Sequence, residues 1–422
     1  MSRIGERDAS GDRWVRARHP APRPVAMLTH SYYEEDPRVR REAEAIVAAG
    51  RPVDVYALRR PEDASTEVLD GVTVVRLGVQ RHQGAGLGTY LREYLAFLVR
   101  AGVALTRAHR RRQYGLVQVH TLPDFLVFAA LPLRLVGVPV ILDLHEAMPE
   151  FFRSRFRGRA GRIGYALLRL QERAATGFAK AVLTVNDALG DRLIGIGVPA
   201  SKLTVVPNAP SLARFDPARH LARPFMADGT LRLVYAGALS PIYELDVVLA
   251  AIARLAAQRP DLPVCLDLYG RDFAEVPLRD QASALGVADR VAFHGRIPIE
   301  AVPAAIARAD VGLAPTRRSE FTDFSLSTKA YEYAAMGRTV VASRLPMVER
   351  IFGDDIVTYE PGDADDLAAA LLRLVDEPVA REARVIRALD RVRDLGWEHE
   401  SARYLALIED LASGPGVTRP AG

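Results

Sequence analysis

Short apolar runs that alternate with amphipathic helical patterns constrain the fold of this chain more than any other feature. The runs are rich in Val, Ile and Leu, and helical patterns such as residues 39–49 and 125–136 lie between most of them. Repeated strand, helix, strand units predict a parallel sheet that is covered on both faces. The expected strands are residues 25–29, 53–57, 72–77, 116–120, 140–144, 181–185 and 203–206, then 231–235, 264–269, 291–294, 311–314 and 339–342.

The chain has 422 residues, which is too long for one ordinary core, so we expect two domains. Each is an α/β, Rossmann-like doubly wound domain, and the two face each other across a cleft. The expected boundaries are a disordered leader at 1–23, an N-terminal domain at 24–208, a Pro-rich hinge at 209–229, a C-terminal domain at 230–395, a C-terminal helix at 396–412 that can cross back to the N-terminal domain, and a disordered tail at 413–422.

Composition excludes several classes of protein. Hydrophobic residues make up 49% and charged residues 26%, as in ordinary globular proteins, and the formal charge is +4. The arginines are dispersed without a nucleic-acid motif, so nucleic acid is not expected as a partner. The one cysteine, Cys265, lies in an apolar run, which favours a reducing cytoplasm over a disulfide-forming compartment. The longest apolar stretch, 125–142, is interrupted by proline, arginine and glycine, so no membrane span is expected.

The segment 316–343 reads as a loop, a helix and a strand. Short polar residues at 325, 327 and 328 open the helical pattern, and a helix start offers free N–H groups and a positive dipole end to an anion. Lys329 and Glu332 project from one face about one turn apart. Such a set suits a nucleotide diphosphate whose ribose needs an acceptor, although an ordinary capped helix with a solvated Lys and Glu pair fits the same residues. Only three lysines occur among 56 basic residues.

Polar residues also follow several of the expected strands, at the edge where parallel sheets bind ligands. A single histidine at a strand end is more often a packing residue than a catalytic one, but several such groups from both halves predict a shared site. The residues concerned are His30, Ser31, Tyr32, His120, Asp124, His145, Glu146, Asn208, Gly237 and Arg271.

Taken in order, the motifs resemble the retaining glycosyltransferases of family 4, also called glycosyl transferases group 1, which have the GT-B fold. The resemblance runs from about residue 25 to residue 411. It is carried by DPRVR at 36–40, His120 with PDFL at 123–126, DLHEAMPE at 143–150, VPNAP at 206–210, YAG at 235–237 and TKAYEYAAMG at 328–337.

The resemblance implies transfer of a sugar from a UDP- or GDP-type nucleotide sugar to a glycan or lipid-linked acceptor, with retention, in cell-surface polysaccharide or glycoconjugate synthesis. It implies no cofactor and no metal. Glu332 matches the second glutamate of the family's Glu-x7-Glu motif and would bind the ribose, Lys329 would bind the phosphates, and His145 would contact the donor sugar. The implied catalytic residues are His145, Lys329 and Glu332, the donor-binding residues Gly237, Arg271, Ser325, Ser327, Thr328, Lys329 and Glu332, and the acceptor-side residues Tyr32, His120 and Asp124.

Three departures from the family pattern keep other interpretations open. Phe324 stands where the first glutamate would fall, residues 238–244 carry no cation, and Ser31-Tyr32-Tyr33 replaces a glycine-rich turn. The missing positive charge could come from Arg271, or from Arg317 and Arg318. The alternatives are a catalytically silent GT-B subunit or scaffold and, with less support, a nucleotide-sugar epimerase.

Two segments, 90–112 and 151–162, combine apolar side chains with many arginines. A basic amphipathic helix can lie on an anionic leaflet, which would make the protein peripheral on the inner face of the plasma membrane. The same pattern also fits a helix that packs on the sheet while its arginines reach solvent. The sequence supports both interpretations equally.

Overall fold

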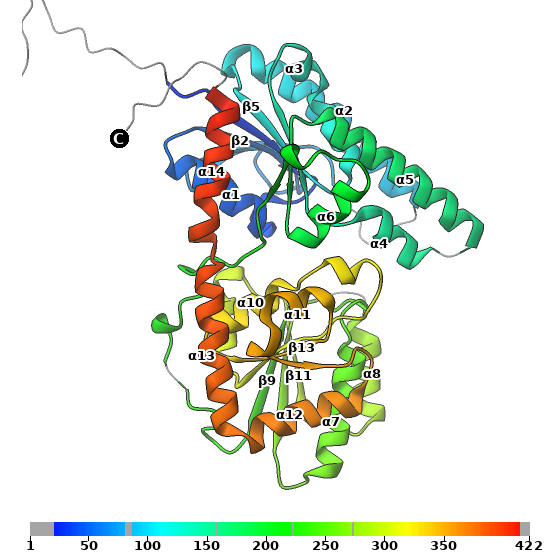
Figure 1. Cartoon of the computed structure of the whole chain (residues 1–422), viewed down its shortest axis with the longest axis vertical. Coiled ribbons are helices and arrows are strands. Elements are labelled where there is room, and N and C mark those ends of the chain that lie inside the picture. Colours follow the sequence, from blue (N-terminus) through cyan, green and yellow to red (C-terminus); the bar gives the residue numbers. More distant parts are fainter. Residues whose placement is uncertain (1–20, 81–86, 157, 222, 272–273, 414–422) are drawn as a thin grey trace, which may run out of the picture.

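The computed structural model describes residues 21–80, 87–156, 158–221, 223–271 and 274–413. It contains two α/β domains, one above the other in Figure 1, each built on a mainly parallel sheet. The mixed α/β fold predicted from the sequence is thereby confirmed. Residues 1–20 and 414–422, where the sequence predicts most of a leader and a tail, lie outside the described residues.

The sheet of the first domain has the strand order β3-β4-β2-β1-β5-β6-β7-β8. Neighbouring strands are parallel except β3, which runs antiparallel to β4 at the edge. The predicted strands are present, but β3 is an additional one that the sequence analysis missed. The bounds are β1 (Val25–Leu28), β2 (Val53–Leu58), β3 (Thr66–Leu69), β4 (Val72–Leu77), β5 (Leu116–His120), β6 (Val140–Leu144), β7 (Ala181–Thr184) and β8 (Leu203–Val205).

Helices cover both faces of this first sheet. One face holds α2 (Leu87–Arg112), the 3-10 helix η2 (Asp124–Ala130), α3 (Leu131–Leu135) and α5 (Gly158–Phe178), and α1 (Pro37–Ala48) packs on the other. The single helix expected at 125–136 is divided into η2 and α3, with Pro132 in the first turn of α3. Proline suits a helix start because it has no N–H to donate. The chain also forms α4 (Met148–Arg155) and α6 (Asp187–Gly195).

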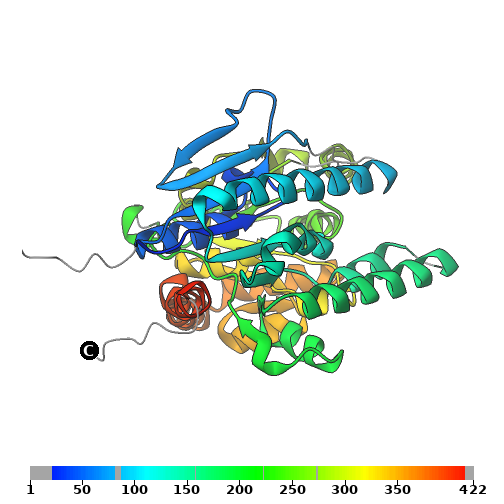
Figure 2. The same cartoon turned by 90° about the horizontal axis from the view of Figure 1, so that it is seen from above.

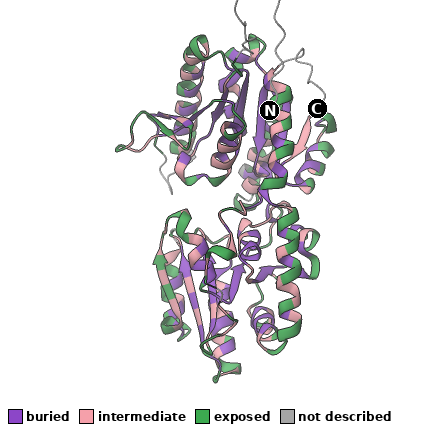
Figure 3. Ribbon diagram, turned by 90° about the vertical axis from the view of Figure 1, so that its left-hand side faces the viewer, coloured by how far each residue is buried: buried purple, intermediate pink, exposed green. Residues whose placement is uncertain are grey.

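The second sheet has the order β11-β10-β9-β12-β13-β14, and all its strands are parallel. Its short edge strand β14 is again one that the sequence analysis missed. In Figure 3 the strands of both sheets are largely buried. The bounds are β9 (Leu231–Ala236), β10 (Val264–Tyr269), β11 (Val291–Gly295), β12 (Val311–Ala314), β13 (Thr339–Ser343), β14 (Val357–Tyr359), α7 (Leu245–Gln258), α8 (Glu275–Ala284), α9 (Val302–Ala307), α10 (Thr328–Ala335), α11 (Pro346–Phe352), α12 (Ala364–Asp376), α13 (Pro378–Asp394) and α14 (Trp397–Ser413).

The last two helices join the domains. In Figure 1 α13 runs along the second domain and α14 along the first. Tyr404 and Ile408 of α14 are buried in the core of the first domain, and the Tyr404 hydroxyl donates to Gln118 Oε1 at 2.7 Å. At the junction, Arg41 of α1 lies over the ring of Trp397 and donates to Asn208 Oδ1 at 2.9 Å. Asn208, at the end of the first domain, and Trp397, at the start of α14, are therefore both held against α1.

The carboxyl ends of the two sheets face each other, and side chains connect the domains around this boundary. Asn186 Nδ2 donates to the carbonyl of Phe324 at 2.8 Å, and Arg296 pairs with Glu35 at 3.0 Å. Phe151 of α4 contacts Phe321 edge to face. The loops that follow the strands of one domain are thus held near those of the other. No helix among the described residues is both long and apolar enough to cross a bilayer.

Candidate active site

Helix α10 carries the second domain's part of the candidate site. It begins at Thr328, directly after β12 and its long loop, and no side chain caps its N-terminus. Its first turn therefore leaves backbone N–H groups directed toward the domain boundary. Lys329 and Glu332 lie three residues apart on this helix, so their side chains emerge about one turn apart.

Lys329 is buried, with only 7% of its surface exposed. Its Nζ lies 4.0 Å from the centroid of the Tyr243 ring and 5.1 Å from that of Tyr235. The side chain passes so close to Gly237 that a Cβ there would lie 2.2 Å from Lys329 Cε. Among the described residues no carboxylate comes within ion-pair distance of this ammonium. The site thus holds a cation that aromatic faces partly shield and that forms no ion pair among the described residues.

Glu332 is half-buried on the same helix. Burial raises the pKa of its carboxyl group, and Lys329 and Arg214 partly offset this effect. Within the part of the chain that is described, the carboxylate forms no hydrogen bond, so it is available to a ligand donor. Tyr333, its neighbour, instead points into the core and accepts a hydrogen bond from Ala236 N at 3.0 Å.

In the first domain, two histidines from neighbouring strands meet around one carboxylate. His120 ends β5 and His145 follows β6, and their rings stack with centroids 5.6 Å apart. Asp143 Oδ2 lies 2.9 Å from His120 Nδ1 and 3.4 Å from His145 Nε2. The amide of His145 also donates to Thr121 Oγ1 at 3.2 Å. The side chains are nearly fully buried, so this arrangement fixes both rings.

The charges of this group follow from burial and from its neighbours. Burial is the largest influence on His145 and, with Arg38 and His120, lowers its pKa to about 3 despite the attraction of Asp143. Burial acts in the same direction on His120, but Asp143 outweighs it and raises the pKa. The pKa of Asp143 is lowered because His145, His120 and Arg38 outweigh its burial. His145 is therefore neutral at physiological pH beside an ionised Asp143.

His120, Asp143 and His145 also form the one group of described residues whose ligand atoms lie close enough to hold a metal ion, all within 4.8 Å. The sequence analysis found no such cluster, because Asp143 was not recognised as a member. The contact of His120 with the carboxylate and the 3.4 Å hydrogen-bonding distance between His120 Nδ1 and His145 Nε2 account for the short distances without an ion. His120 Nε2 and His145 Nδ1 are left buried without a partner among the described residues.

Two acceptor-side residues lie apart from the histidines. Asp124, the first residue of η2, is buried beside Glu172 and Arg192. Burial and the Glu172 carboxylate raise the pKa of Asp124 to about 7, and Arg192 partly opposes them. Tyr32 lies beneath the guanidinium of Arg60, with 4.1 Å from Cζ to its ring centroid. The structure thus brings His120 and His145 together but places Asp124 in a separate charged cluster.

The remaining donor-side residues differ in whether their polar groups already have hydrogen-bond or ion-pair partners. Ser325 lies three residues before α10 rather than in its first turn, and its amide donates to the Thr322 carbonyl at 3.2 Å. Arg317 makes two 3.0 Å contacts with Asp246, and Arg318 lies 3.4 Å from Asp323. Arg271 is exposed directly after β10. Of the three arginines considered for the missing positive charge, two are thus paired with acidic side chains.

Sequence reasoning did not identify Asp143, Tyr235 or Tyr243 as site residues. Asp143 had a detectable signal, because it interrupts the buried strand VILDL, where an unpaired charge would be costly. The two tyrosines had none, since their contact with Lys329 arises only when β9 and the loop after it fold against α10.

Two Rossmann-like domains with facing strand ends, joined by a terminal helix that returns to the first domain, define the GT-B class of glycosyltransferases. Comparison with known protein families also indicates a glycosyltransferase. Residues 36–209 match the family described as glycosyl transferase 4-like domain, and residues 230–377 match glycosyl transferases group 1. The chain belongs to this glycosyltransferase family.

Curated relatives are also glycosyltransferases. The MMP alpha-(1->4)-mannosyltransferase of Mycolicibacterium hassiacum is 26% identical over 91% of this chain and 90% of its own length. A phosphatidyl-myo-inositol mannosyltransferase of Mycolicibacterium smegmatis is 32% identical over 50% of this chain and 53% of its own length.

Solved structures share the fold at low identity. Sucrose-phosphate synthase from Thermosynechococcus elongatus superposes with a TM-score of 0.76 at 18% identity, covering 93% of this chain and 100% of that one. HepE from Anabaena in complex with UDP-glucose superposes with a TM-score of 0.68 at 15% identity, covering 92% of this chain and 99% of that one.

Proposed function

We propose that this protein transfers a sugar from a nucleotide diphosphate sugar to a hydroxyl acceptor, with retention at the anomeric carbon. The buried ammonium of Lys329, which forms no ion pair with an acidic side chain among the described residues, carries the proposal. A buried cation without an ion-pair partner is costly unless an anion completes the site. A diphosphate at the start of α10 would supply that anion and also receive the free N–H groups of the first turn.

In this proposal the residues around Lys329 each bind a different part of the donor. Glu332, one turn further along α10, accepts from the ribose hydroxyls, and Ser327 and Thr328 present the amides of the helix start. Ser325 shapes the loop before the helix, since its amide is already used. Arg271 adds positive charge from the end of β10. We propose that these groups neutralise the leaving diphosphate without a metal ion or a cofactor.

The first domain supplies the residues around the reacting carbon. His145 is neutral, so its unpartnered Nδ1 can accept a hydrogen bond from a hydroxyl of the donor sugar, while Asp143 holds the ring. We assign His120, whose ring stacks on that of His145, to the acceptor side. In the reaction the bond from the anomeric carbon to the phosphate oxygen breaks, a bond to the acceptor oxygen forms on the same face, and the acceptor proton passes to the leaving diphosphate.

The proposed donor is of the UDP or GDP type. Solved structures with the same fold include a complex with UDP-glucose and a UDP-forming trehalose-phosphate synthase from Burkholderia xenovorans, which supports UDP. Relatives named as mannosyltransferases and as a D-inositol 3-phosphate glycosyltransferase support a polyol or glycan acceptor, free or lipid-linked. Such a product fits the synthesis of cell-surface polysaccharides or glycoconjugates.

The test is the release of nucleoside diphosphate from a panel of UDP and GDP sugars, with and without a mixture of glycan and glycolipid acceptors. We expect release from one donor to rise when an acceptor is added, and the anomeric proton coupling in the product to report retention. A panel in which no donor is either bound or consumed would refute the proposal.

One observation favours a second candidate, a catalytically silent GT-B subunit. Phe324 stands where the family has a glutamate, and its carbonyl is used in the contact with Asn186 between the domains. Binding of a nucleotide diphosphate without turnover of any donor would support this candidate. Turnover of one donor would exclude it.

A further inference from the structure

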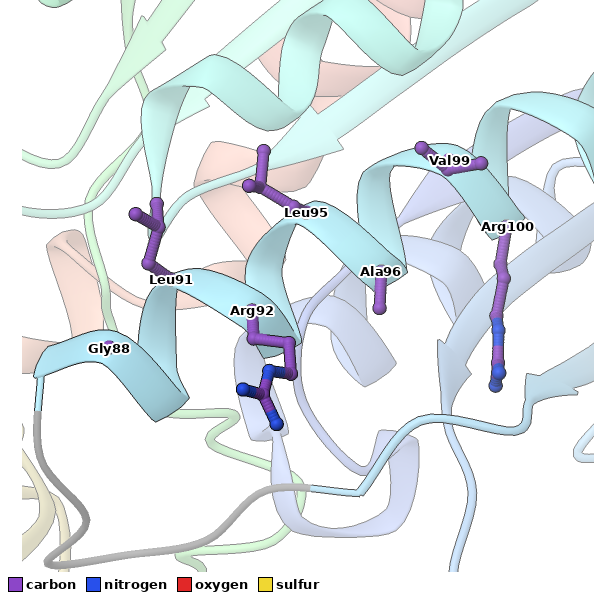
Figure 4. A pocket seen from close by; sticks show the side chains of 7 residues that line it. All are labelled: Gly88, Leu91, Arg92, Leu95, Ala96, Val99 and Arg100. Carbon is purple, nitrogen blue, oxygen red and sulfur yellow. The ribbon is translucent and has the colours of Figure 1, made fainter.

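Helix α2 is apolar on two opposite faces. Its buried residues, among them Phe97 and Leu105, pack into the core beneath the helix. A residue two positions along the helix from a buried one points about 200° away from it, and residues at this offset form the opposite face. It carries Leu91, Leu95, Val99 and Val103, which are 51%, 46%, 62% and 44% exposed. Figure 4 shows Leu91, Leu95 and Val99 on one side of α2, with Arg92 and Arg100 directed elsewhere. The outward face of a surface helix is normally polar, so this apolar row needs an explanation.

Helix α5 repeats the pattern. Ile163, Leu167 and Leu170 lie one turn apart and are 55%, 61% and 66% exposed, whereas Ala175 is buried in the core. Both helices pack on the same face of the first sheet, with η2 and α3 between them (Figures 1 and 2). Their buried sides point toward the sheet, so their exposed rows both point away from it. We call these two rows, together with Leu135 of α3, the outer helical face.

The charge on this face has one sign. The acidic residues of α2 and α5 are Glu93 and Glu172, and both are buried. Exposed arginines flank the apolar rows, and they are Arg92, Arg107, Arg110, Arg111, Arg159, Arg162 and Arg173. A surface that combines apolar rows with arginines and no exposed acidic side chain is complementary to an anionic, partly apolar partner.

We propose that the outer helical face binds an anionic phospholipid leaflet. The apolar rows would enter the boundary between headgroups and acyl chains, and the arginines would meet the lipid phosphates. A second copy of this chain fits less well, because a symmetric contact would oppose arginine with arginine. The run 110–112 contributes less than its sequence suggests, since Arg112 is paired with Asp54 at 2.7 Å.

The position of the face also bears on the acceptor, a point that rests on the proposed function. Helix α4 packs on α5 and reaches the second domain through the contact between Phe151 and Phe321. A leaflet on the outer helical face would therefore lie beside the boundary between the domains, where a lipid-linked acceptor could enter.

The experiment measures binding of the full chain to vesicles by flotation. The vesicles contain phosphatidylcholine alone or with about one-third phosphatidylglycerol, at low and high salt. The test variant combines Leu95→Gln, Val99→Gln and Leu167→Gln. The matched control combines Val276→Gln, Val379→Gln and Ile386→Gln, which replace apolar side chains on α8 and α13 that are at least as exposed as those of the test variant.

We expect the wild type and the control to bind the anionic vesicles at low salt and to dissociate as salt rises. The test variant should bind at least about tenfold more weakly than the wild type, because its apolar side chains no longer enter the leaflet. Absence of the wild type from floated vesicles at low salt would overturn the proposal, as would equal binding by the test variant. The proposal would also be overturned if the wild type bound an acidic protein but no vesicles. It would be overturned as well if the wild type formed a dimer that only the test variant lost. Calorimetry with UDP and GDP on the same variants reports the donor site separately, so failure of one proposal does not imply failure of the other.

Discussion

Replacing Lys329 with methionine tests the donor site most directly. Methionine keeps a similar length but removes the charge that lies over Tyr243 and beside Gly237. A charge-assisted hydrogen bond contributes about 1.5 to 3 kcal/mol, so the dissociation constant for the nucleoside diphosphate should rise about ten- to a hundredfold. The bare nucleoside lacks the phosphates, so its affinity should hardly change. Isothermal titration calorimetry with UDP, GDP and the two nucleosides measures both effects.

The same substitution makes a prediction about stability. Without a ligand the ammonium is buried and unpaired, so Lys329→Met should leave the melting temperature unchanged or raise it. The increase in melting temperature that the nucleoside diphosphate produces in the wild type should shrink in parallel with its affinity. Lys329→Arg should restore little, because a planar fork does not occupy the volume of an ammonium.

Lys202→Met is the matched control for this experiment. The Lys202 Nζ donates to the carbonyl groups of Thr176 and Gly177, at 3.0 and 3.3 Å, in the first domain away from α10. This control should bind the nucleoside diphosphate as the wild type does. Equal losses for nucleoside and nucleoside diphosphate, or no loss at all, would show that Lys329 does not hold the diphosphate.

The other predictions concern three more residues. Glu332→Gln should weaken UDP and uridine by the same factor, about tenfold or more, since both contain the ribose; calorimetry in which only UDP is affected would contradict the assignment. Gly237→Ala should resemble Lys329→Met in the same assay, because the new methyl group would displace the lysine; wild-type affinity would show that the contact is not needed. Asp124→Asn should stabilise the fold at pH 8 by up to about 4 kcal/mol in urea unfolding, and hardly at pH 4. The Asp124 pKa of about 7 exceeds the ordinary 3.8, so the folded state binds more protons between these values and wild-type stability falls as pH rises. Identical pH dependence of the two proteins would contradict this reasoning.

Most of the fold follows from the sequence because its central strands are buried on both faces. Strands such as β5 and β6 are continuous apolar runs that only a covered parallel sheet accommodates. The sequence analysis missed two strands, for different reasons. Residues Thr66–Leu69 form an edge strand that is almost fully exposed, so no apolar pattern marks it, and Val357–Tyr359 is only three residues long. Each forms because a neighbouring strand offers unpaired backbone groups.

The second domain's part of the site was accessible to sequence reasoning because it is local. Lys329 and Glu332 share one helix, so helix geometry alone places them together. The loop before that helix was less accessible, because Ser325 hydrogen-bonds into the short 3-10 turn at Thr322–Phe324 rather than joining α10. Competition between local turns and a helix start depends on the packed loop, which propensity does not describe.

The first domain's part depends on contacts between strands that are far apart in the sequence. His120 and His145 were recognised by their positions after strands, but the carboxylate that orients them lies within β6. Asp143 can remain charged there because two imidazoles and Arg38 lower its pKa against the effect of burial. Burial, Arg38 and His120 leave His145 neutral against the attraction of Asp143, and the aspartate lies against the ring that we assign to the donor sugar. A charged residue inside an otherwise apolar strand therefore indicates partners from other elements, because it can be buried only if they surround it. In this sheet Asp143 indicates the two histidines of the site, whereas Asp54 of β2 indicates a structural contact with Arg112.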